Sequence, residues 1–139
     1  EIGVRLVGSE MCIRDRIWRD QMALGLTTWA EMPEPSRSDC HAWGASPNIE
    51  FYRILLGIDS DAPGFRKIRI APSLGKLKEV SGTIPHPLGS VTAAYKLNER
   101  GEGTARLVLP EGTTGIFIWN GKEIPLKPGE QVISLSLRH

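Results

Sequence analysis

The chain has 139 residues, of which 40% are hydrophobic and 24% are charged, and this composition is that of a folded globular protein rather than a disordered one. Its 17 Lys and Arg residues nearly balance its 16 Asp and Glu residues, so it lacks the basic charge that holds a nucleic-acid backbone. No apolar run reaches the roughly 18 residues of a membrane-spanning helix. We therefore expect one compact domain, or a small domain joined to the end of a larger one, with neither nucleic acid nor membrane as a partner.

In the N-terminal segment, residues 1–16, the stretch from residue 3 to residue 16 shows neither a helical nor a strand-like hydrophobic period. Within them, LVGSEMCIRDR resembles a peptide that arises when sequencing-adapter DNA is translated in frame. We expect this segment to be artefactual and the natural protein to continue upstream of Ile17. The two cysteines, Cys12 and Cys40, fit neither a disulfide framework nor a zinc-binding spacing, so we expect free or buried thiols.

The apolar residues of the segment 17–24, IWRDQMAL, fit a short helix, and Gly25 is placed to end it with a left-handed cap. The loop that follows contains Pro33 and Pro35. Two prolines so close together exclude a regular helix and favour an extended path. The sequence therefore predicts a loop of fixed course between two helices.

A second helix is predicted over about residues 40–56, with Ser38 or Asp39 as its N-cap and Gly57 as its C-terminal cap. Pro47 lies inside this segment, so we expect a kink or a break near it. The residues beyond the proline form a strong apolar face. This face predicts that the helix packs against a larger structure.

The turn-rich segment 59–65, DSDAPGF, is the expected domain boundary. After it, hydrophobic residues alternate with polar ones in about seven short segments separated by Gly, Pro or Asn. Asn120-Gly121 is a strong signal for a tight hairpin, because both residues tolerate positive φ. The sequence therefore predicts an antiparallel β-sandwich from about Arg66 to Leu137. We expect its aromatic residues in the core or at a hinge, and His86 in a structural role; these aromatics are Phe65, Tyr95, Phe117 and Trp119.

Polar and aromatic residues that could carry chemistry are concentrated between the two predicted helices. Glu31 lies on the proline-stiffened loop, and it could act as a general base, because glycoside hydrolysis uses paired acids and flat apolar surfaces. On spacing alone, a solvated loop glutamate is the commoner case. His41 could donate to a substrate hydroxyl or be an ordinary helix-start histidine. Trp29 and Trp43 could form a platform for a sugar ring, although one of them is expected in a core.

The remaining polar residues of the loop are better explained by structure. Arg37 and Asp39 flank Ser38 and are expected to tie the loop to the helix, while Glu34 lies between prolines and is expected to be exposed. Cys40 has no basic neighbours that would mark a nucleophile. The chain has neither a Gly-rich phosphate loop nor a metal-ligand spacing, so neither metal nor cofactor is predicted.

Two stretches carry a family resemblance: TTWAEMPEPSRSDCHAWGASPNIEFYRILLGI at residues 27–58 and PGFRKIRIAPSLGKLKEVSGTIPHPLGSV at residues 63–91. Together they resemble the C-terminal region of bacterial α-L-rhamnosidases of glycoside hydrolase family 78. The resemblance is strong from Gly25 to about Leu97 and loose over the remaining strands. It implies a mainly β chain, in which residues 17–58 are the C-terminal end of an (α/α)6 catalytic barrel and residues 66–139 are a C-terminal β-sandwich.

The resemblance also implies an activity: hydrolysis of terminal α-L-rhamnose from glycans or glycosides, with inversion of configuration and without metal or organic cofactor. The family's general base matches Glu31, and a histidine that contacts the bound rhamnose matches His41. Many members have an aromatic residue directly before the base, whereas here Ala30 precedes Glu31 and Trp29 comes one position earlier. We carry Trp29 forward as a substrate-binding candidate.

An inverting mechanism needs a second carboxylic acid about 6.5–9.5 Å from the base, and the chain offers no candidate for it. We therefore expect the general acid in an upstream catalytic domain, and no activity from this polypeptide alone. A different class remains open, in which the chain is a carbohydrate-binding or purely structural β-sandwich module. A third possibility is another inverting (α/α)6 hydrolase with a different sugar.

Overall fold

The structure is a computed structural model that describes residues 18–31 and 38–136. The chain divides into two compact units, Glu1–Pro47 and Asn48–His139. The predictions for residues 1–16, including Cys12, and those for the prolines, Glu34 and Arg37 of the loop lie outside the described residues. Among the helices of the described ranges, none has the length and hydrophobicity of a membrane-spanning segment.

The first unit begins with a helix over residues 18–23. Gly25 follows it with a φ of 74°, which confirms the predicted left-handed cap, because glycine adopts this conformation without a steric penalty. Residues 26–31 and 38–41 follow without regular secondary structure.

The second helical region, expected as one helix over residues 40–56, consists of three short helical segments. They are a 3-10 helix η1 (Ala42–Ala45), an α-helix α2 (Ser46–Glu50) and a π-helix η2 (Phe51–Leu55). The change from η1 to α2 comes immediately before Pro47, where a break was expected. Proline is tolerated in the first turn of an α-helix, because its missing N–H has no helical partner there. The α-helix therefore begins at Ser46, with Pro47 as its second residue.

The N-cap prediction is wrong. The cap of η1 is His41, whose backbone is extended and whose side chain makes no capping hydrogen bond. Ser38 and Asp39 lie too far ahead of the first helical residue to cap it. At the other end, Gly57 has a φ of 73°, which confirms the predicted C-terminal cap.

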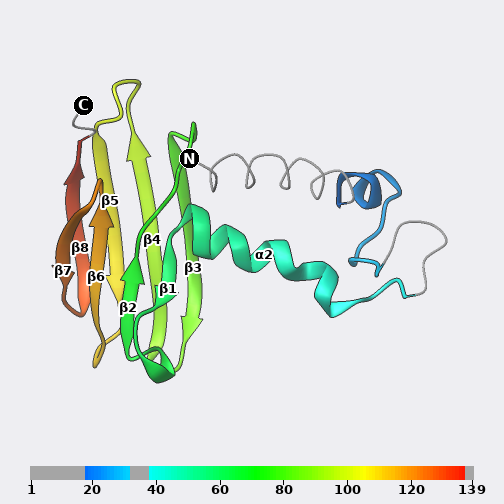
Figure 1. The fold of residues 1–139 in the computed structure, drawn as a ribbon, viewed down its shortest axis with the longest axis horizontal. Coiled ribbons are helices and arrows are strands. Elements are labelled where there is room, and N and C mark those ends of the chain that lie inside the picture. Colours follow the sequence, from blue (N-terminus) through cyan, green and yellow to red (C-terminus); the bar gives the residue numbers. More distant parts are fainter. Residues whose placement is uncertain (1–17, 32–37, 137–139) are drawn as a thin grey trace. The chain divides into compact units, whose positions relative to one another are not determined.

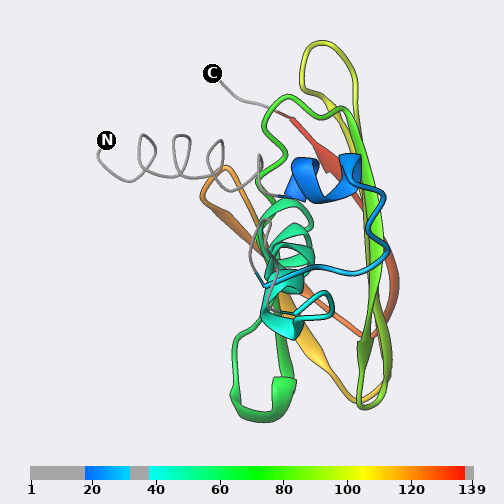
Figure 2. The same cartoon turned by 90° about the vertical axis from the view of Figure 1, so that its right-hand side faces the viewer.

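The second unit is a β-sandwich of two four-stranded sheets (Figures 1 and 2). Its strands are β1 (Ile58–Ser60), β2 (Lys67–Ile70), β3 (Glu79–His86), β4 (Gly89–Leu97), β5 (Gly103–Leu109), β6 (Thr114–Trp119), β7 (Lys122–Leu126) and β8 (Gly129–Leu135). One sheet has the order β1-β2-β6-β7 and the other the order β3-β4-β5-β8. The predicted mainly β fold is confirmed, although the first strand begins at Ile58, ahead of the expected start near Arg66.

One pairing departs from the antiparallel expectation, because β2 and β6 are parallel, with Ile68 opposite Gly115. Parallel neighbours need a crossover connection. Here the chain leaves the first sheet after β2, forms β3, β4 and β5 of the second sheet, and returns as β6 (Figure 1). The crossover links the two layers of the sandwich.

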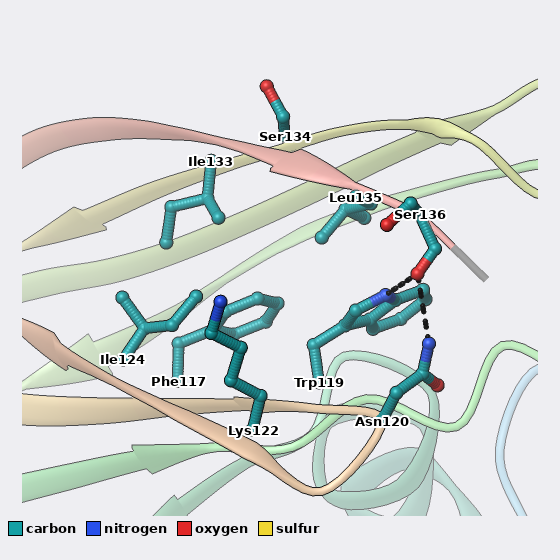
Figure 3. Close-up of a pocket in the computed structure, with 9 residues that line it drawn as sticks. All are labelled: Phe117, Trp119, Asn120, Lys122, Ile124, Ile133, Ser134, Leu135 and Ser136. Atoms are coloured by element: carbon teal, nitrogen blue, oxygen red, sulfur yellow. Dashed lines mark hydrogen bonds between the residues drawn. The ribbon is translucent and has the colours of Figure 1, made fainter. Parts of the chain in front are cut away.

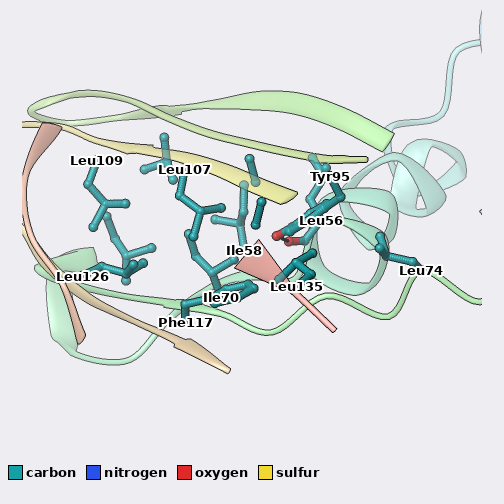
Figure 4. Close-up of a cluster of buried hydrophobic side chains, with 14 residues drawn as sticks. Leu56, Ile58, Ile70, Leu74, Tyr95, Leu107, Leu109, Phe117, Leu126 and Leu135 are labelled. Carbon is teal, nitrogen blue, oxygen red and sulfur yellow. Dashed lines mark hydrogen bonds between the residues drawn. The ribbon is translucent and has the colours of Figure 1, made fainter. Parts of the chain in front are cut away.

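Alternate residues of the strands point into one core (Figure 4). On β2 the buried residues are Ile68 and Ile70, while Lys67 and Arg69 between them are exposed. This period of two is what a strand with one covered face requires. The complete buried cluster is Leu56, Ile58, Ile68, Ile70, Leu74, Val91, Ala93, Tyr95, Ala105, Leu107, Leu109, Phe117, Leu126 and Leu135.

Tyr95 joins this core to the end of the helical region. Its ring is buried, and its hydroxyl donates a hydrogen bond of 2.7 Å to the carbonyl of Leu56. Burial also raises the pKa of the Tyr95 phenol above its ordinary value, since a phenolate would lose its hydration there. The aromatic residues of the sandwich were expected in the core or at a hinge, and they lie in or against the core: Tyr95 and Phe117 are buried, while Phe65 and Trp119 are partly buried and pack against the cluster.

The turns between strands include the predicted hairpin. Asn120 and Gly121 have φ values of 51° and 74° between β6 and β7, as a type I′ turn requires. At the end of β3, the backbone N–H of Leu88 donates to Nδ1 of His86 over 3.1 Å. Nε2 of His86 must then carry the proton, and it donates to the Phe65 carbonyl over 2.8 Å. His86 thus has the structural role that we expected.

Candidate functional site

The candidate site is the loop between the two helical regions, and its two ends are hydrogen bonded to each other. The backbone N–H of Glu31 donates to the carbonyl of Ser38 over 2.9 Å, and the N–H of His41 donates to the carbonyl of Trp29 over 2.8 Å. Glu31 and Trp29 therefore lie on one side of a closed loop, and His41 lies on the other. The three residues singled out from the sequence are brought into one local structure.

A side chain adds to this closure. The hydroxyl of Thr28 donates to the carbonyl of Asp39. Asp39 was expected to tie the loop to the helix, whereas this contact uses its backbone carbonyl and joins the two ends of the loop to each other. The hydrogen bonds at both ends leave residues 28–31 and 38–41 with a defined course.

The residue before Glu31 is held from outside the loop. Oε1 of Gln21 accepts a hydrogen bond of 2.8 Å from the backbone N–H of Ala30, and Nε2 of Gln21 lies 3.5 Å from the carbonyl of the same residue. Both residues are buried, with exposed fractions of 3% for Gln21 and 4% for Ala30. A side-chain amide is suited to this role, because it offers a donor and an acceptor to one peptide.

Sequence reasoning did not find Gln21. The predicted helix was judged by its apolar residues, among them Met22, whose side chain is 65% exposed in the structure. The only available signal was position: Gln21 is three residues after Trp18 and so shares its helix face. A buried glutamine at such a position indicates a specific hydrogen-bond partner.

The start of the second helical region packs on the same part of the loop. Nε1 of Trp18 donates to the carbonyl of Gly44 over 2.8 Å. A Cβ atom at Gly44 would lie 2.9 Å from Cβ of Trp29 and 3.1 Å from the carbonyl oxygen of Ala30. Only glycine permits this approach, so η1 is pressed against the backbone beside Glu31.

The side chains of the candidate residues differ in exposure. Glu31, His41 and Trp29 are half-buried, which leaves each of them accessible to a small molecule. Trp43, the other candidate for a sugar platform, is 81% exposed. Cys40 is an exposed free thiol, so it has no place in a core. Within the described ranges, no cluster of His, Cys, Asp or Glu is arranged to hold a metal ion.

The sandwich has a hollow of its own, a cavity of about 190 Å³ between β6, β7 and the end of β8 (Figure 3). Nε1 of Trp119 and Nδ2 of Asn120 both donate to the carbonyl of Ser136, over 3.1 Å and 3.0 Å. The indole of Trp119 also stacks on the ring of Phe117, with 6.4 Å between centroids. The indole N–H and the Asn120 amide are therefore already hydrogen bonded to another part of the sandwich. The residues lining the cavity are Phe117, Trp119, Asn120, Lys122, Ile124, Ile133, Ser134, Leu135 and Ser136.

Two carboxylates of the sandwich titrate below their ordinary range. The guanidinium of Arg106 on β5 donates two hydrogen bonds, of 2.8 Å and 2.7 Å, to Glu130 on β8, and these lower the pKa of Glu130. The pKa of Asp59 is lowered by the backbone N–H of Ser60 and by Arg53. The Arg106–Glu130 pair joins two strands of one sheet, whereas Arg53 joins the helical segment η2 to Asp59 on β1.

Comparisons with known proteins show which solved structures share this fold. The chain is similar to several solved structures, three of which are α-L-rhamnosidases. The structure from Aspergillus terreus has a TM-score of 0.76 and 18% sequence identity, and the match covers 86% of this chain and 16% of that chain. The structure from Streptomyces avermitilis, complexed with L-rhamnose, has a TM-score of 0.72 and 18% identity, with 86% of this chain and 15% of that chain covered. The structure from Dictyoglumus thermophilum has a TM-score of 0.59 and 23% identity, with 70% of this chain and 12% of that chain covered. At these identities the likeness shows a shared fold. The chain spans less than a fifth of the length of each of these proteins.

A search of curated proteins found no match. The family described as the bacterial alpha-L-rhamnosidase C-terminal domain matches residues 57–133, which is more than half of the chain. The matched segment begins at the Gly57 cap and contains all strands from β1 to β7 and most of β8. The chain therefore belongs to the bacterial alpha-L-rhamnosidase C-terminal domain family.

Proposed function

We propose that this chain is the C-terminal part of an inverting glycoside hydrolase that removes terminal α-L-rhamnose from glycans or glycosides, and that it supplies the loop with the general base, Glu31. In this proposal residues 17–58 complete an (α/α)6 catalytic domain, and residues 66–139 form the sandwich that supports it. The family membership of residues 57–133 supports the class of enzyme. The observation that carries the site is the closed loop, which sets Glu31 and His41 on facing sides.

In the proposed reaction, the carboxylate of Glu31 takes a proton from a water molecule as that water attacks the anomeric carbon of rhamnose. A second carboxylic acid protonates the leaving oxygen on the other side of the sugar. That acid comes from another part of the enzyme, so the 139-residue chain alone is expected to be inactive. His41 hydrogen bonds a sugar hydroxyl, and Trp29 offers its ring to an apolar face of the sugar.

The local structure suits a general base in two respects. The half-buried side chain of Glu31 has access to water without being fully solvated. Its backbone N–H donates a hydrogen bond to the carbonyl of Ser38. This bond holds the backbone of Glu31, from which the carboxylate extends, in a defined position. A base gains from such fixation, because its effect depends on its distance from the attacking water.

The test is substitution of Glu31 in the full-length enzyme that contains this chain. Glu31→Gln keeps the size of the side chain but removes its basicity, so kcat on an aryl α-L-rhamnoside should fall by about 10²–10⁴-fold with the folded state intact. NMR of the first product formed should show inversion at the anomeric carbon in the unmodified enzyme. A near-normal kcat for Glu31→Gln, or retention of configuration, would remove Glu31 from this role.

His41→Ala serves as the companion variant, because it should raise KM for the rhamnoside more than it lowers kcat. Cys40→Ser is a matched control next to His41, since Cys40 is an exposed free thiol and has no part in the proposal. An unchanged KM for His41→Ala would return the histidine to a structural role.

The cavity at Trp119 is an observation that favours a sugar-binding module instead. The indole N–H of Trp119 is hydrogen bonded to Ser136, and one face of its ring stacks on Phe117. These contacts favour a supporting sandwich, because they leave less of the indole for a sugar. Titration of the chain with L-rhamnose, followed by NMR, separates the two functions. A supporting sandwich leaves the signals of Trp119 and Asn120 unchanged, whereas a binding module shifts them.

A further inference from the structure

Gln21 is a buried polar side chain that the proposed mechanism does not use. We propose that Gln21 is a positioning residue: by holding the backbone of Ala30 it sets the direction in which the Glu31 side chain leaves the loop. This inference rests on the proposed function, because it concerns the placement of the same general base. The structural part of the proposal, that Gln21 holds the backbone of the loop at Ala30, can be tested without measuring activity.

The backbone around Glu31 is held at three successive residues. The carbonyl of Trp29 accepts from His41, the N–H of Ala30 donates to Gln21, and the N–H of Glu31 donates to Ser38. The outer two bonds join the loop to itself. Of these three bonds, the one from Gln21 ties the segment to a neighbouring helix.

The direction of a side chain follows from the peptide planes on either side of its Cα atom. The peptide between Ala30 and Glu31 contains the Ala30 carbonyl, which lies 3.5 Å from Nε2 of Gln21, and the Glu31 N–H, which is bonded to Ser38. The preceding peptide contains the Ala30 N–H, which is bonded to Oε1 of Gln21 at 2.8 Å. Gln21 therefore opposes rotation of both peptides, and with them displacement of the Glu31 carboxylate.

The helix that carries Gln21 has a second attachment that does not involve Ala30. The indole of Trp18 donates to the carbonyl of Gly44. Removing the amide of Gln21 should therefore release Ala30 while the helix stays in place. This separation allows loss of positioning to be distinguished from loss of the folded state.

The decisive variant is Gln21→Met in the full-length enzyme, because methionine keeps the length of glutamine but has no amide. A displacement of the base on the scale of 1 Å is worth up to about 100-fold in rate, so we expect kcat to fall by about 10- to 100-fold with KM nearly unchanged. In the Glu31→Gln background the same substitution should cause no further loss of kcat, since Gln21 acts only through Glu31.

The chain contains a matched control. Gln131 clamps the backbone of Lys127 in the same manner, with Oε1 accepting from its N–H over 3.1 Å and Nε2 donating to its carbonyl over 2.7 Å. Gln131→Met removes an equivalent pair of hydrogen bonds from the sandwich. It should leave kcat and KM unchanged.

A direct readout is amide hydrogen exchange in the chain itself. In Gln21→Met the Ala30 and Glu31 amides should exchange faster, while amides of the sandwich strands should not. If Gln21→Met does not fold, Gln21→Asn, which keeps the amide but is too short to reach Ala30, carries the same expectations.

The outcomes separate the two proposals. Unchanged exchange at Ala30, or a wild-type kcat in a folded Gln21→Met enzyme that has lost only thermal stability, would overturn the positioning role. A near-normal kcat for Glu31→Gln would instead overturn the proposed function, whatever the exchange data show. Faster exchange together with a lower kcat that is absent in the Glu31→Gln background would establish both.

Discussion

Tyr95 combines a buried ring with a hydroxyl that satisfies the carbonyl of Leu56. Tyr95→Phe keeps the ring but leaves that carbonyl without its partner, so the free energy of unfolding should fall by about 1–3 kcal/mol. Urea denaturation of the chain at pH 7 measures this loss. Tyr52→Phe is the control, because Tyr52 is 37% exposed and should cost little.

The same residue predicts a pH dependence. The folded state raises the pKa of Tyr95 above its ordinary value of 10.0, so folded Tyr95 keeps its proton where unfolded Tyr95 loses it. Its contribution to stability is complete below pH 10 and declines as the pH rises further, by about 1.4 kcal/mol for each unit. The stability difference between wild type and Tyr95→Phe should therefore shrink above pH 10. A constant difference would contradict the burial of the phenol.

At the scale of single residues, the sequence predicted the glycine caps Gly25 and Gly57 correctly from local pattern. The composition of the loop pointed to Glu31, His41 and Trp29, a resemblance supplied their roles, and those functional roles stay predictions. Gln21 was missed because its importance depends on one buried backbone N–H, which no sequence pattern reveals. Ser38 and Asp39 were preferred as caps for their side chains, whereas the structure places the cap at His41, where the backbone turns helical.

Gly57 and Gly121 allow the cost of a strained backbone conformation to be separated from the cost of a steric clash, because both have positive φ but only Gly57 is closely surrounded. Both have positive φ, 73° and 74°, so alanine at either position costs about 1–2 kcal/mol. A Cβ at Gly57 would also lie 2.2 Å from the carbonyl carbon of Ala71, whereas one at Gly121 meets nothing within 4 Å. Overpacking adds about 1–3 kcal/mol, so Gly57→Ala should lower the unfolding free energy well beyond Gly121→Ala. Equal losses in urea denaturation would show that Gly57 is not crowded.

Elements defined by local sequence were predicted well, and pairings between distant segments were not. The hairpin at Asn120-Gly121 is encoded by two adjacent residues. The alternation of exposed and buried side chains on β2 is encoded by its four consecutive residues. The parallel pairing of β2 with β6 joins residues that are far apart in the sequence, and an alternating strand fits a parallel or an antiparallel neighbour equally well. The hydrophobic pattern of the sequence also did not reveal that the second helical region is divided into 3-10, α and π segments.

For the whole molecule, the exposed apolar residues of the helical region are the feature with the largest consequence. Ile49 is 58% exposed and Phe51 is 56% exposed. In the proposed enzyme the catalytic domain would cover them. The chain by itself should therefore associate as its concentration rises, since exposed apolar patches promote association.

Sedimentation velocity over a range of concentrations measures this association. The double variant Ile49→Ser, Phe51→Ser should shift the chain toward monomer. Val132→Ser should not, although Val132 on β8 is exposed to 64%. A wild-type chain that stays monomeric at high concentration would show that these residues are not part of an interface.

The parallel pairing of β2 and β6 also sets an order of events during synthesis. Lys67 on β2 is paired with Thr114 on β6, so on the ribosome β2 is complete well before its neighbour has been translated. The hairpins of the other layer can close in the meantime, because their partners follow one another along the chain. Until β6 emerges, β2 is an open strand edge, and the cationic side chains of Lys67 and Arg69 discourage its pairing with another nascent polypeptide.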